Sequence, residues 1–313
     1  MNIDNHRETT PDGHPIMEWR VEASAYRATP SLGARLMSWD LSVAGNTRSV
    51  VYWPQENVNW QKPGSIRGGN PILFPFCGRS FFNGEIGQWK TPEGEICPMK
   101  QHGYARDGVF ETESCWDKGF QSRYVPDDAA KKAYPYKYEF RIKYQFEALG
   151  FQVDMLLTNH DERPIPWSAG HHFYFTLPWH AAASRGDYLV ELDAKKAFYH
   201  QEDGALAPAE RPVHHTPANE PALRDRIHCQ LRRPEARLVT RNEEEAVRVR
   251  TGGEQLRTPS RWETFVTWIE NDDAPYYCLE PWMGPPNSTE HQNGLHFVSP
   301  GETGEFSCRV DLS

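Results

Sequence analysis

The chain has 313 residues and a formal net charge of −9, with 25% charged and 38% hydrophobic residues. This composition is typical of a globular protein with a sizeable core, and the length suits one large all-β domain or two smaller domains. The acidic balance argues against nucleic-acid binding, because proteins that bind the phosphate backbone need clustered Lys and Arg.

The six cysteines are scattered and form neither a CxxC pair nor a Cys/His spacing typical of zinc sites. Scattered cysteines in a chain of this length indicate free thiols in a reducing compartment. The N-terminus lacks the apolar segment of a signal peptide, and no run of about 18 apolar residues follows. We therefore expect a cytoplasmic protein without a membrane partner.

Residues 1–15 are polar and are predicted to form a flexible tail, which leaves 16–313 as a single domain. Beyond the tail, short apolar or alternating runs separated by turn residues predict strands. The polar segment 118–132, interrupted by Pro126, is predicted to be a loop. The clearest alternation covers 138–146, and residues 148–150 are predicted to form its hairpin turn. Further strands are predicted at 50–53, 151–157, 188–192, 237–239, 246–250, 265–269, 276–279 and 304–310.

Many short strands and almost no helical periodicity indicate a large all-β sandwich or barrel. Four segments of the chain carry residues suited to chemistry. In the first, at 67–79, glycines and a proline predict a turn between Arg67 and Arg79, and arginine is a rigid fork of donors. In the second, at 101–108, His102 is followed by Gly103 and Arg106. Each of these two segments, taken alone, is also compatible with a structural loop.

The third segment, at 167–178, contains two adjacent histidines. Successive side chains of a strand point to opposite faces, so His172 shares the more polar face with Tyr174 and Thr176. His171 shares the face of Phe173 and Phe175. The alternation therefore favours His172 as the working residue, and it excludes one metal ion held by both histidines.

The fourth segment, at 277–287, places Glu280 at the end of an apolar strand, where Pro281 is expected to end the ladder. A carboxylate in such a place is costly unless it is paired or used, so Glu280 is a candidate general base. Trp282 could form a wall against a sugar ring. An exposed glutamate at a strand end is the alternative.

Taken together and in this order, the four segments resemble the aldose 1-epimerase superfamily, also called galactose mutarotase-like. The closest resemblance is to the branch of the hexose-6-phosphate epimerases. The matching residues are Arg67-Gly68-Gly69-x-Pro71 to Gly78-Arg79, Gln101 to Arg106, His172-x-Tyr174-Phe175 and Glu280-Pro281-Trp282. The resemblance covers the chain from about residue 20 to its C-terminus and implies one β-sandwich of the supersandwich type.

The resemblance also implies roles for individual residues. His172 matches the catalytic acid and Glu280 the catalytic base. Phe173 departs from the pattern, since a proline usually follows this histidine, and Asp225 is the best candidate for the family's substrate-binding aspartate. Trp282 is expected to contact substrate as well. The other implied pocket residues are Arg67, Arg79, Gln101, His102 and Arg106.

The implied reaction opens and recloses an aldose ring. Glu280 would take the proton of the anomeric hydroxyl while His172 gives one to the ring oxygen. We expect no metal and no organic cofactor, because the step is nearly isoenergetic and already occurs slowly in water. The expected ligand is a sugar or a sugar phosphate, and the expected assembly is a monomer or a homodimer.

Two other functions compete with this reading. A non-catalytic carbohydrate-binding protein could use the same sandwich and aromatic walls without needing a His/Glu pair. A glycoside hydrolase would use two carboxylates flanking the bond, whereas this chain offers one carboxylate and one histidine. Arg67, Arg79 and Arg106 point to a phosphorylated sugar, unless they pair with nearby carboxylates such as Asp107.

Overall fold

The computed structural model describes residues 8–210, 214–252 and 258–313. Of the expected flexible tail, residues 1–7 lie outside the described residues. Residues 8–15 form a local turn, in which Thr9 bridges to Pro15 and Ile16 N–H donates to Glu8 O at 2.8 Å. Within this turn, Thr10 is buried and His14 Nδ1 lies 3.0 Å from Ser31 Oγ. None of the helices in the described part of the chain has the length and apolar character that a membrane span requires.

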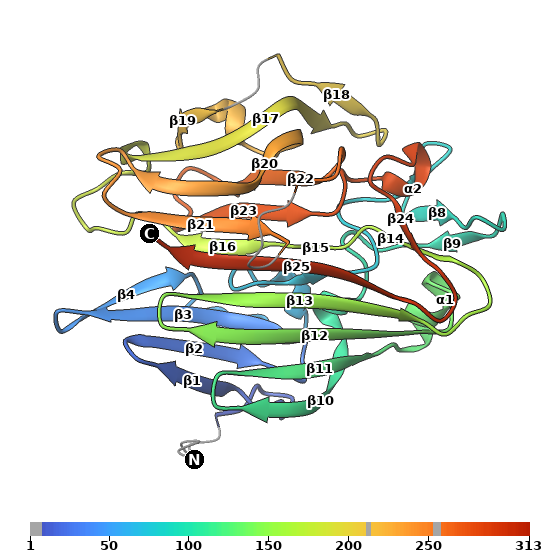
Figure 1. Ribbon diagram of the computed structural model, residues 1–313, viewed down its shortest axis with the longest axis horizontal. Helices are drawn as coiled ribbons and strands as arrows, with labels where there is room; N and C mark the ends of the chain where they lie inside the picture. The colour runs from blue at the N-terminus through green and yellow to red at the C-terminus, as the bar shows by residue number, and fades with distance from the viewer. Residues whose placement is uncertain (1–7, 211–213, 253–257) are drawn as a thin grey trace.

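Two antiparallel sheets form the fold (Figure 1). Sheet I runs from the N-terminal strands at one edge to strands of the C-terminal half. Its strands, in order of pairing, are β1 (Met17–Val21), β2 (Ser24–Thr29), β3 (Arg35–Val43), β4 (Asn46–Val51), β16 (Phe173–Thr176) with β15 (Gly170–His171), β23 (Tyr276–Trp282) and β22 (Thr264–Trp268).

Sheet II begins in the middle of the sequence and ends with the last strand of the chain. Its strands, in order of pairing, are β10 (Val109–Trp116), β11 (Gly119–Val125), β12 (Tyr138–Glu147), β13 (Gly150–Asn159), β25 (Thr303–Leu312) and β21 (Ala246–Thr251). The predicted alternation is confirmed in β12, where Phe140, Ile142, Tyr144 and Phe146 are fully buried.

The two sheets meet along one pair of long strands, β17 (Tyr188–His200) and β20 (Arg226–Thr240). The first three residues of β20 pair with β22 of sheet I, whereas residues 235–239 pair with β21 of sheet II. β17 runs along the other side of β20, and the short strands β18 (Leu206–Pro208) and β19 (His215–Pro217) pair with β17. One strand pair therefore belongs to both sheets.

The core lies between the sheets and is rich in aromatic rings. Tyr26 of sheet I stacks on Phe146 of sheet II, with ring centroids 4.5 Å apart. Farther along, Phe173 packs edge-on against Phe151 at 5.9 Å. These contacts confirm the expected large all-β sandwich, and they leave the other face of sheet I free for a site.

The predicted loop at 118–132 is wrong, because it contains β11 and the helix α1 (Asp128–Ala133). β11 lies between β10 and β12, and burial of Phe120 and Tyr124 compensates for its polar residues. Asp127 is the N-cap of α1, and its side chain accepts a hydrogen bond from Ala130 N–H at 2.7 Å. Local polarity hid both elements.

The remaining elements are short. The strands are β5 (Ile72–Leu73), β6 (Phe81–Phe82), β7 (Glu85–Ile86), β8 (Gln88–Lys90), β9 (Ile96–Pro98), β14 (Ile165–Trp167) and β24 (His296–Val298), and the helices are α2 (Ser288–His291) and the 3₁₀ turns Pro63–Ser65, Ala105–Asp107, Arg185–Asp187 and Pro221–Leu223.

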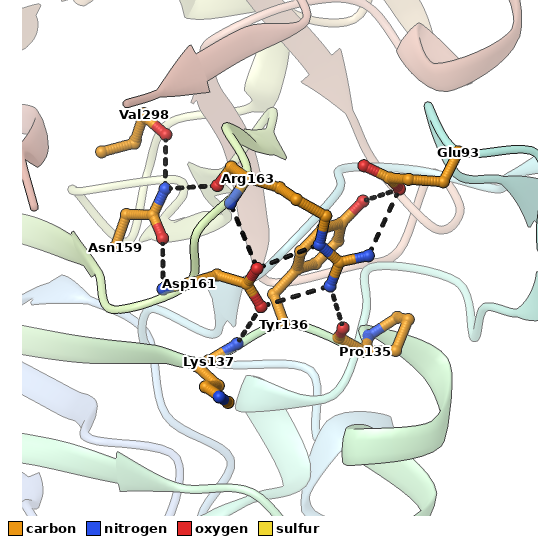
Figure 2. Close-up of polar contacts among 8 residues, drawn as sticks. All are labelled: Glu93, Pro135, Tyr136, Lys137, Asn159, Asp161, Arg163 and Val298. Atoms are coloured by element: carbon orange, nitrogen blue, oxygen red, sulfur yellow. Dashed lines mark hydrogen bonds and ion pairs between the residues drawn. The ribbon is translucent and has the colours of Figure 1, made fainter. Parts of the chain in front are cut away.

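A polar cluster fixes the turn between β13 and β14 (Figure 2). Asp161 accepts from Arg163 Nε at 2.9 Å, and Arg163 Nη2 donates to Pro135 O at 3.0 Å. Asn159 Nδ2 donates to Arg163 O and to Val298 O, both at 2.8 Å. The cluster ties the start of the segment that leads to His171 and His172 to the backbone at Pro135 and to β24.

Candidate functional site

His172 and Glu280 face each other across two paired strands. The register that joins Gly170 to Trp282 also joins Phe173 to Leu279, and it places His172 directly opposite Glu280. Directly opposite residues of antiparallel strands project from the same face of the sheet. Accordingly, His172 Nε2 lies 3.4 Å from Glu280 Oε1, and both side chains are buried.

Glu280 lies inside β23 rather than at its end, so the expected strand end at Pro281 is wrong. β23 continues to Trp282, and Pro281 pairs with Phe265 of β22. On the other side of β23, His172 belongs to neither β15 nor β16. On this side of β23, pairing stops at Leu279 and resumes at Trp282. The missing N–H of Pro281 therefore lies in that gap and not at the end of the strand.

The adjacent histidines point to opposite faces, as the alternation predicts. His171 is fully buried and stacks between Phe173 at 5.2 Å and Phe306 at 6.0 Å, in the core between the sheets. Burial lowers the pKa of His171 to about 3. His172 faces the outer side of sheet I.

Asn70 determines how both histidines sit. Its Nδ2 donates to His171 Nδ1 at 3.0 Å and to Tyr144 OH at 2.7 Å, while its Oδ1 accepts from His172 N–H at 3.2 Å. The preceding Gly69 has φ +68°, and a Cβ there would lie 2.1 Å from Leu36 O. Glycine is thus required for the chain to pass β3 closely enough to deliver Asn70.

A cavity of about 930 Å³ opens on this face of sheet I. Its lining contains every site residue that the sequence predicted, drawn from segments far apart in the chain. These residues are Arg67, Arg79, Gln101, His102, Arg106, His172, Asp225, Glu280 and Trp282.

Other lining residues were missed by the sequence analysis. Trp268 shares its strand face with Val266, so the alternation of the predicted strand at 265–269 could have identified it. Its ring lies edge-on to His172 at 5.6 Å. His200 ends the long strand β17, and Lys62 and Lys100 lie in loops, where no periodic signal marks them.

His102 is oriented by the backbone around it. Both His102 and Gly103 have positive φ, +64° and +71°, which turns the imidazole toward the cavity. Nδ1 accepts a hydrogen bond from Gly78 N–H at 3.1 Å, so the neutral ring carries its proton on Nε2 and can donate it to a ligand. The ring lies 5.9 Å from that of His172 and 5.7 Å from that of Trp282.

Burial opposes charge on both His172 and Glu280, which we call the facing pair. It raises the pKa of Glu280 well above its usual range, with a further rise from the charge of Asp225. It lowers the pKa of His172 well below its usual range, and nearby His102 and Arg67 act in the same direction. Burial thus favours a neutral imidazole beside a protonated carboxyl.

Two arginines approach the same part of the cavity. The Arg67 guanidinium lies over the Trp268 ring at 5.0 Å, and its Nε is 3.4 Å from Glu270 Oε1. Arg106 Nε is 4.0 Å from Asp107 Oδ2. Burial lowers the pKa of Arg106, and the positive charge of Arg67 lowers it further. The two cations therefore repel each other even though each has a carboxylate nearby.

Arg79 and Asp225 line another part of the cavity. Arg79 Nη2 donates to Gln201 O at 3.4 Å. Asp225 has φ +52°, and burial raises its pKa while the charge of Arg79 lowers it. This position brings Asp225 close enough to Glu280 for their charges to interact.

One buried arginine holds the loop that carries Arg67. Arg35 Nη1 donates to Pro63 O and Nη2 to Ile66 O, each at 2.7 Å, and Nη2 also donates to Gly68 O. Asp107 accepts from Gly64 N–H in the middle of the same loop. The loop that carries Arg67, which forms one wall of the cavity, is therefore held by both Arg35 and Asp107.

The family model described as Aldose 1-epimerase matches residues 22–309 of the chain. A protein of Synechocystis sp. PCC 6803 is 23% identical, with a TM-score of 0.76 and coverage of 98% of both chains. A galactose mutarotase related enzyme from Lactobacillus acidophilus is 19% identical, with a TM-score of 0.76 and coverage of 95% of this chain and 97% of that one. A galactose mutarotase-like protein from Lactobacillus casei is also 19% identical, with a TM-score of 0.73 and coverage of 95% and 100%. No curated protein sequence matches the chain.

Proposed function

Because the chain belongs to the aldose 1-epimerase family, we propose that it interconverts the α and β anomers of an aldose by opening and reclosing the ring. The observation that carries this proposal is the buried contact of 3.4 Å between His172 Nε2 and Glu280 Oε1 at the wall of a sugar-sized cavity. Ring opening needs one group that accepts the proton of the anomeric hydroxyl and one that protonates the ring oxygen. An imidazole and a carboxyl at this separation can bracket both oxygens.

Our proposal assigns the base to Glu280 and the acid to His172. As the ring opens, Glu280 gains the anomeric proton while His172 gives its own to the ring oxygen, so the pair ends with a neutral imidazole and a protonated carboxyl. That is the form favoured by burial. The environment of the pair would therefore stabilise the open-chain intermediate, and rotation of the aldehyde before reclosure yields the other anomer.

The cyclic sugar needs the opposite form of the pair, with a charged carboxylate and an imidazolium. The charge of Arg67 favours that carboxylate, because it lowers the pKa of Glu280. A hydrogen bond from the anomeric hydroxyl to the carboxylate would act in the same direction. Small differences in hydrogen bonding would then move a single proton between the two residues during turnover.

We propose further that the substrate is a 6-phosphorylated aldose. Arg67 and Arg106 repel each other in a partly buried cavity, and a phosphate dianion between them would relieve that repulsion. A neutral sugar would leave the repulsion in place. Lys62 and Lys100 add positive charge to the same lining.

The test of the reaction is saturation-transfer NMR, which reads anomer exchange directly, on glucose and glucose 6-phosphate. We expect His172→Ala and Glu280→Gln each to slow exchange by at least about 10²-fold with the fold retained. A variant of a buried histidine outside the cavity, His228→Gln, is the matched control. Normal exchange in either site variant removes that residue from the mechanism.

A carbohydrate-binding protein without activity is the alternative. In that case Glu280→Gln would leave sugar affinity unchanged, and the wild-type chain would show no exchange above the uncatalysed rate. The buried, facing arrangement of an acid and a base favours the enzyme, because a binding site has no need to desolvate such a pair.

A further inference from the structure

Cys278 lies beside the facing pair and takes no part in the proposed reaction. Among the described residues, His172, Cys278 and Glu280 form a buried group in which one imidazole nitrogen, the thiol sulfur and one carboxylate oxygen all lie within 4.8 Å of one another. We propose that these three side chains form a Zn²⁺ site, and that the bound ion blocks the cavity as an inhibitor. Zinc binding is independent of the proposed function; only the inhibition rests on it.

The strands explain why these three side chains meet. Cys278 and Glu280 are two residues apart in β23, so both side chains project from the same face. Tyr174 pairs with Cys278, which makes His172 the diagonal neighbour of Cys278 as well as the residue opposite Glu280. The trio is therefore held by a rigid sheet and not by loops.

The spacing suits a tetrahedral ion. Zinc binds imidazole nitrogen and carboxylate oxygen at roughly 2.0–2.2 Å, which sets the N···O edge of a tetrahedron at about 3.4 Å. The observed separation of His172 Nε2 and Glu280 Oε1 is 3.4 Å. Each distance to the sulfur would need to shorten by at most about 1.2 Å, because the three ligand atoms lie within 4.8 Å of one another and edges to sulfur are roughly 3.6 Å in such a site.

The donor set selects the metal. One nitrogen, one sulfur and one oxygen are ligands for zinc and its neighbours in the first transition series, whereas Mg²⁺ and Ca²⁺ require oxygen ligands. Cys278 would bind as a thiolate, and its proton leaves to solvent when the ion binds. The thiolate and the Glu280 carboxylate then balance the charge of the ion, which offsets the repulsion from Arg67 and Arg106.

The fourth coordination position would face the cavity. His172 and Glu280 both line it, so an ion can enter from the side on which a sugar would bind. A water molecule or a sugar hydroxyl would complete the tetrahedron, as in open three-ligand zinc sites. The ion would bind both His172 Nε2 and the Glu280 carboxylate, which are the two groups that the proposed reaction needs.

Cobalt absorption tests the site without reference to activity. The reference protein carries Cys115→Ser, because Cys115 is the exposed thiol. We expect Co²⁺ to produce the intense visible absorption of a tetrahedral ion and a thiolate-to-cobalt charge-transfer band, and Zn²⁺ to abolish both. Adding Cys278→Ser should remove the charge-transfer band and weaken Zn²⁺ binding by about 100-fold or more. Adding Cys97→Ser, which replaces another buried thiol, should change neither.

The absence of a charge-transfer band in the reference protein, or its persistence with Cys278→Ser, would overturn the proposal. Glu280→Gln provides a second variant should Cys278→Ser fail to fold: the band should remain while zinc affinity falls by about 10-fold or more, and unchanged affinity would exclude Glu280 as a ligand. Anomer exchange should be inhibited by Zn²⁺ in competition with sugar and unaffected by Mg²⁺. A protein that shows the cobalt band but no exchange would keep the zinc site and lose the proposed function.

Discussion

Asp107 accepts a hydrogen bond from the backbone N–H of Gly64, and the approach is so close that a Cβ on Gly64 would lie 2.4 Å from Asp107 Oδ1. The same carboxylate lies 4.0 Å from Arg106 Nε. Asp107 therefore joins one arginine of the cavity to the loop that carries another, Arg67. It holds the cavity wall in place without touching the facing pair.

Removal of the Asp107 side chain should release this wall. We expect Asp107→Ala to raise KM by about 10-fold or more with kcat nearly unchanged, because a hydrogen bond to a charged group is worth roughly 1.5–3 kcal/mol. Asp107→Asn, which keeps an acceptor for Gly64 N–H, should have an intermediate effect. Exchange kinetics over a range of sugar concentrations measure both constants, with Asp128→Ala on the exposed surface as control. An equal fall in kcat for Asp107→Ala would contradict this role.

Arg106 should distinguish phosphorylated from free sugars. We expect Arg106→Ala to raise KM for glucose 6-phosphate by about 10–100-fold, because the lost contact is charge-assisted, and to leave exchange of glucose within about twofold. Arg123→Ala, on the opposite sheet, is the control for loss of one positive charge. Equal rates of anomer exchange on the two sugars, unchanged by Arg106→Ala, would mean that no arginine of the cavity binds a phosphate.

The pH profile should respond to Asp225. The pair works while it holds one proton, and on the alkaline side that form is lost when the raised pKa of Glu280 is passed. The negative charge of Asp225 contributes to that rise. Asp225→Asn should therefore lower the pKa of Glu280 and move the alkaline limb of kcat/KM to lower pH. A limb that stays in place or moves to higher pH in the measured profile would show that Asp225 does not act on Glu280 through its charge.

Acid should destabilise the fold through its buried histidines. Burial lowers the pKa of His228 to about 3, whereas the unfolded chain binds this proton near 6.5. The stability that depends on His228 is thus complete above pH 6.5 and is lost as the pH falls toward 3, by at most about 5 kcal/mol. We expect His228→Gln to make the free energy of unfolding in urea less dependent on pH between 7 and 4.5. His160→Gln, at an exposed position, should not alter that dependence.

Local alternation explains why the sequence predicts so much of this structure. A period of two identifies strands such as β12 and assigns His171 and His172 to opposite faces, because both properties depend only on neighbouring residues. The roles of the cavity residues came from the resemblance, since no periodic pattern joins Arg67, Arg106 and Glu280.

The structural features that the sequence did not predict depend on strands that are far away in the chain. β11 is polar by composition and is a strand because β10 and β12 enclose it. Pro281 stays within β23 because β22 continues to pair beside it, which nothing near residue 281 reveals. The change of partner along β20 likewise cannot be read locally, since it depends on where β21 and β22 lie.

The shared strand pair β17 and β20 has a consequence for how the molecule opens. Sheet I and sheet II have no boundary along which one could melt while the other stays intact, because β20 is hydrogen-bonded into both. Amide hydrogens at its two ends should exchange with solvent only through the same global opening. The strands of the two sheets also alternate along the sequence, so a cut after β13 would give two fragments that each lack strands of both sheets. Neither fragment should fold until the other is present.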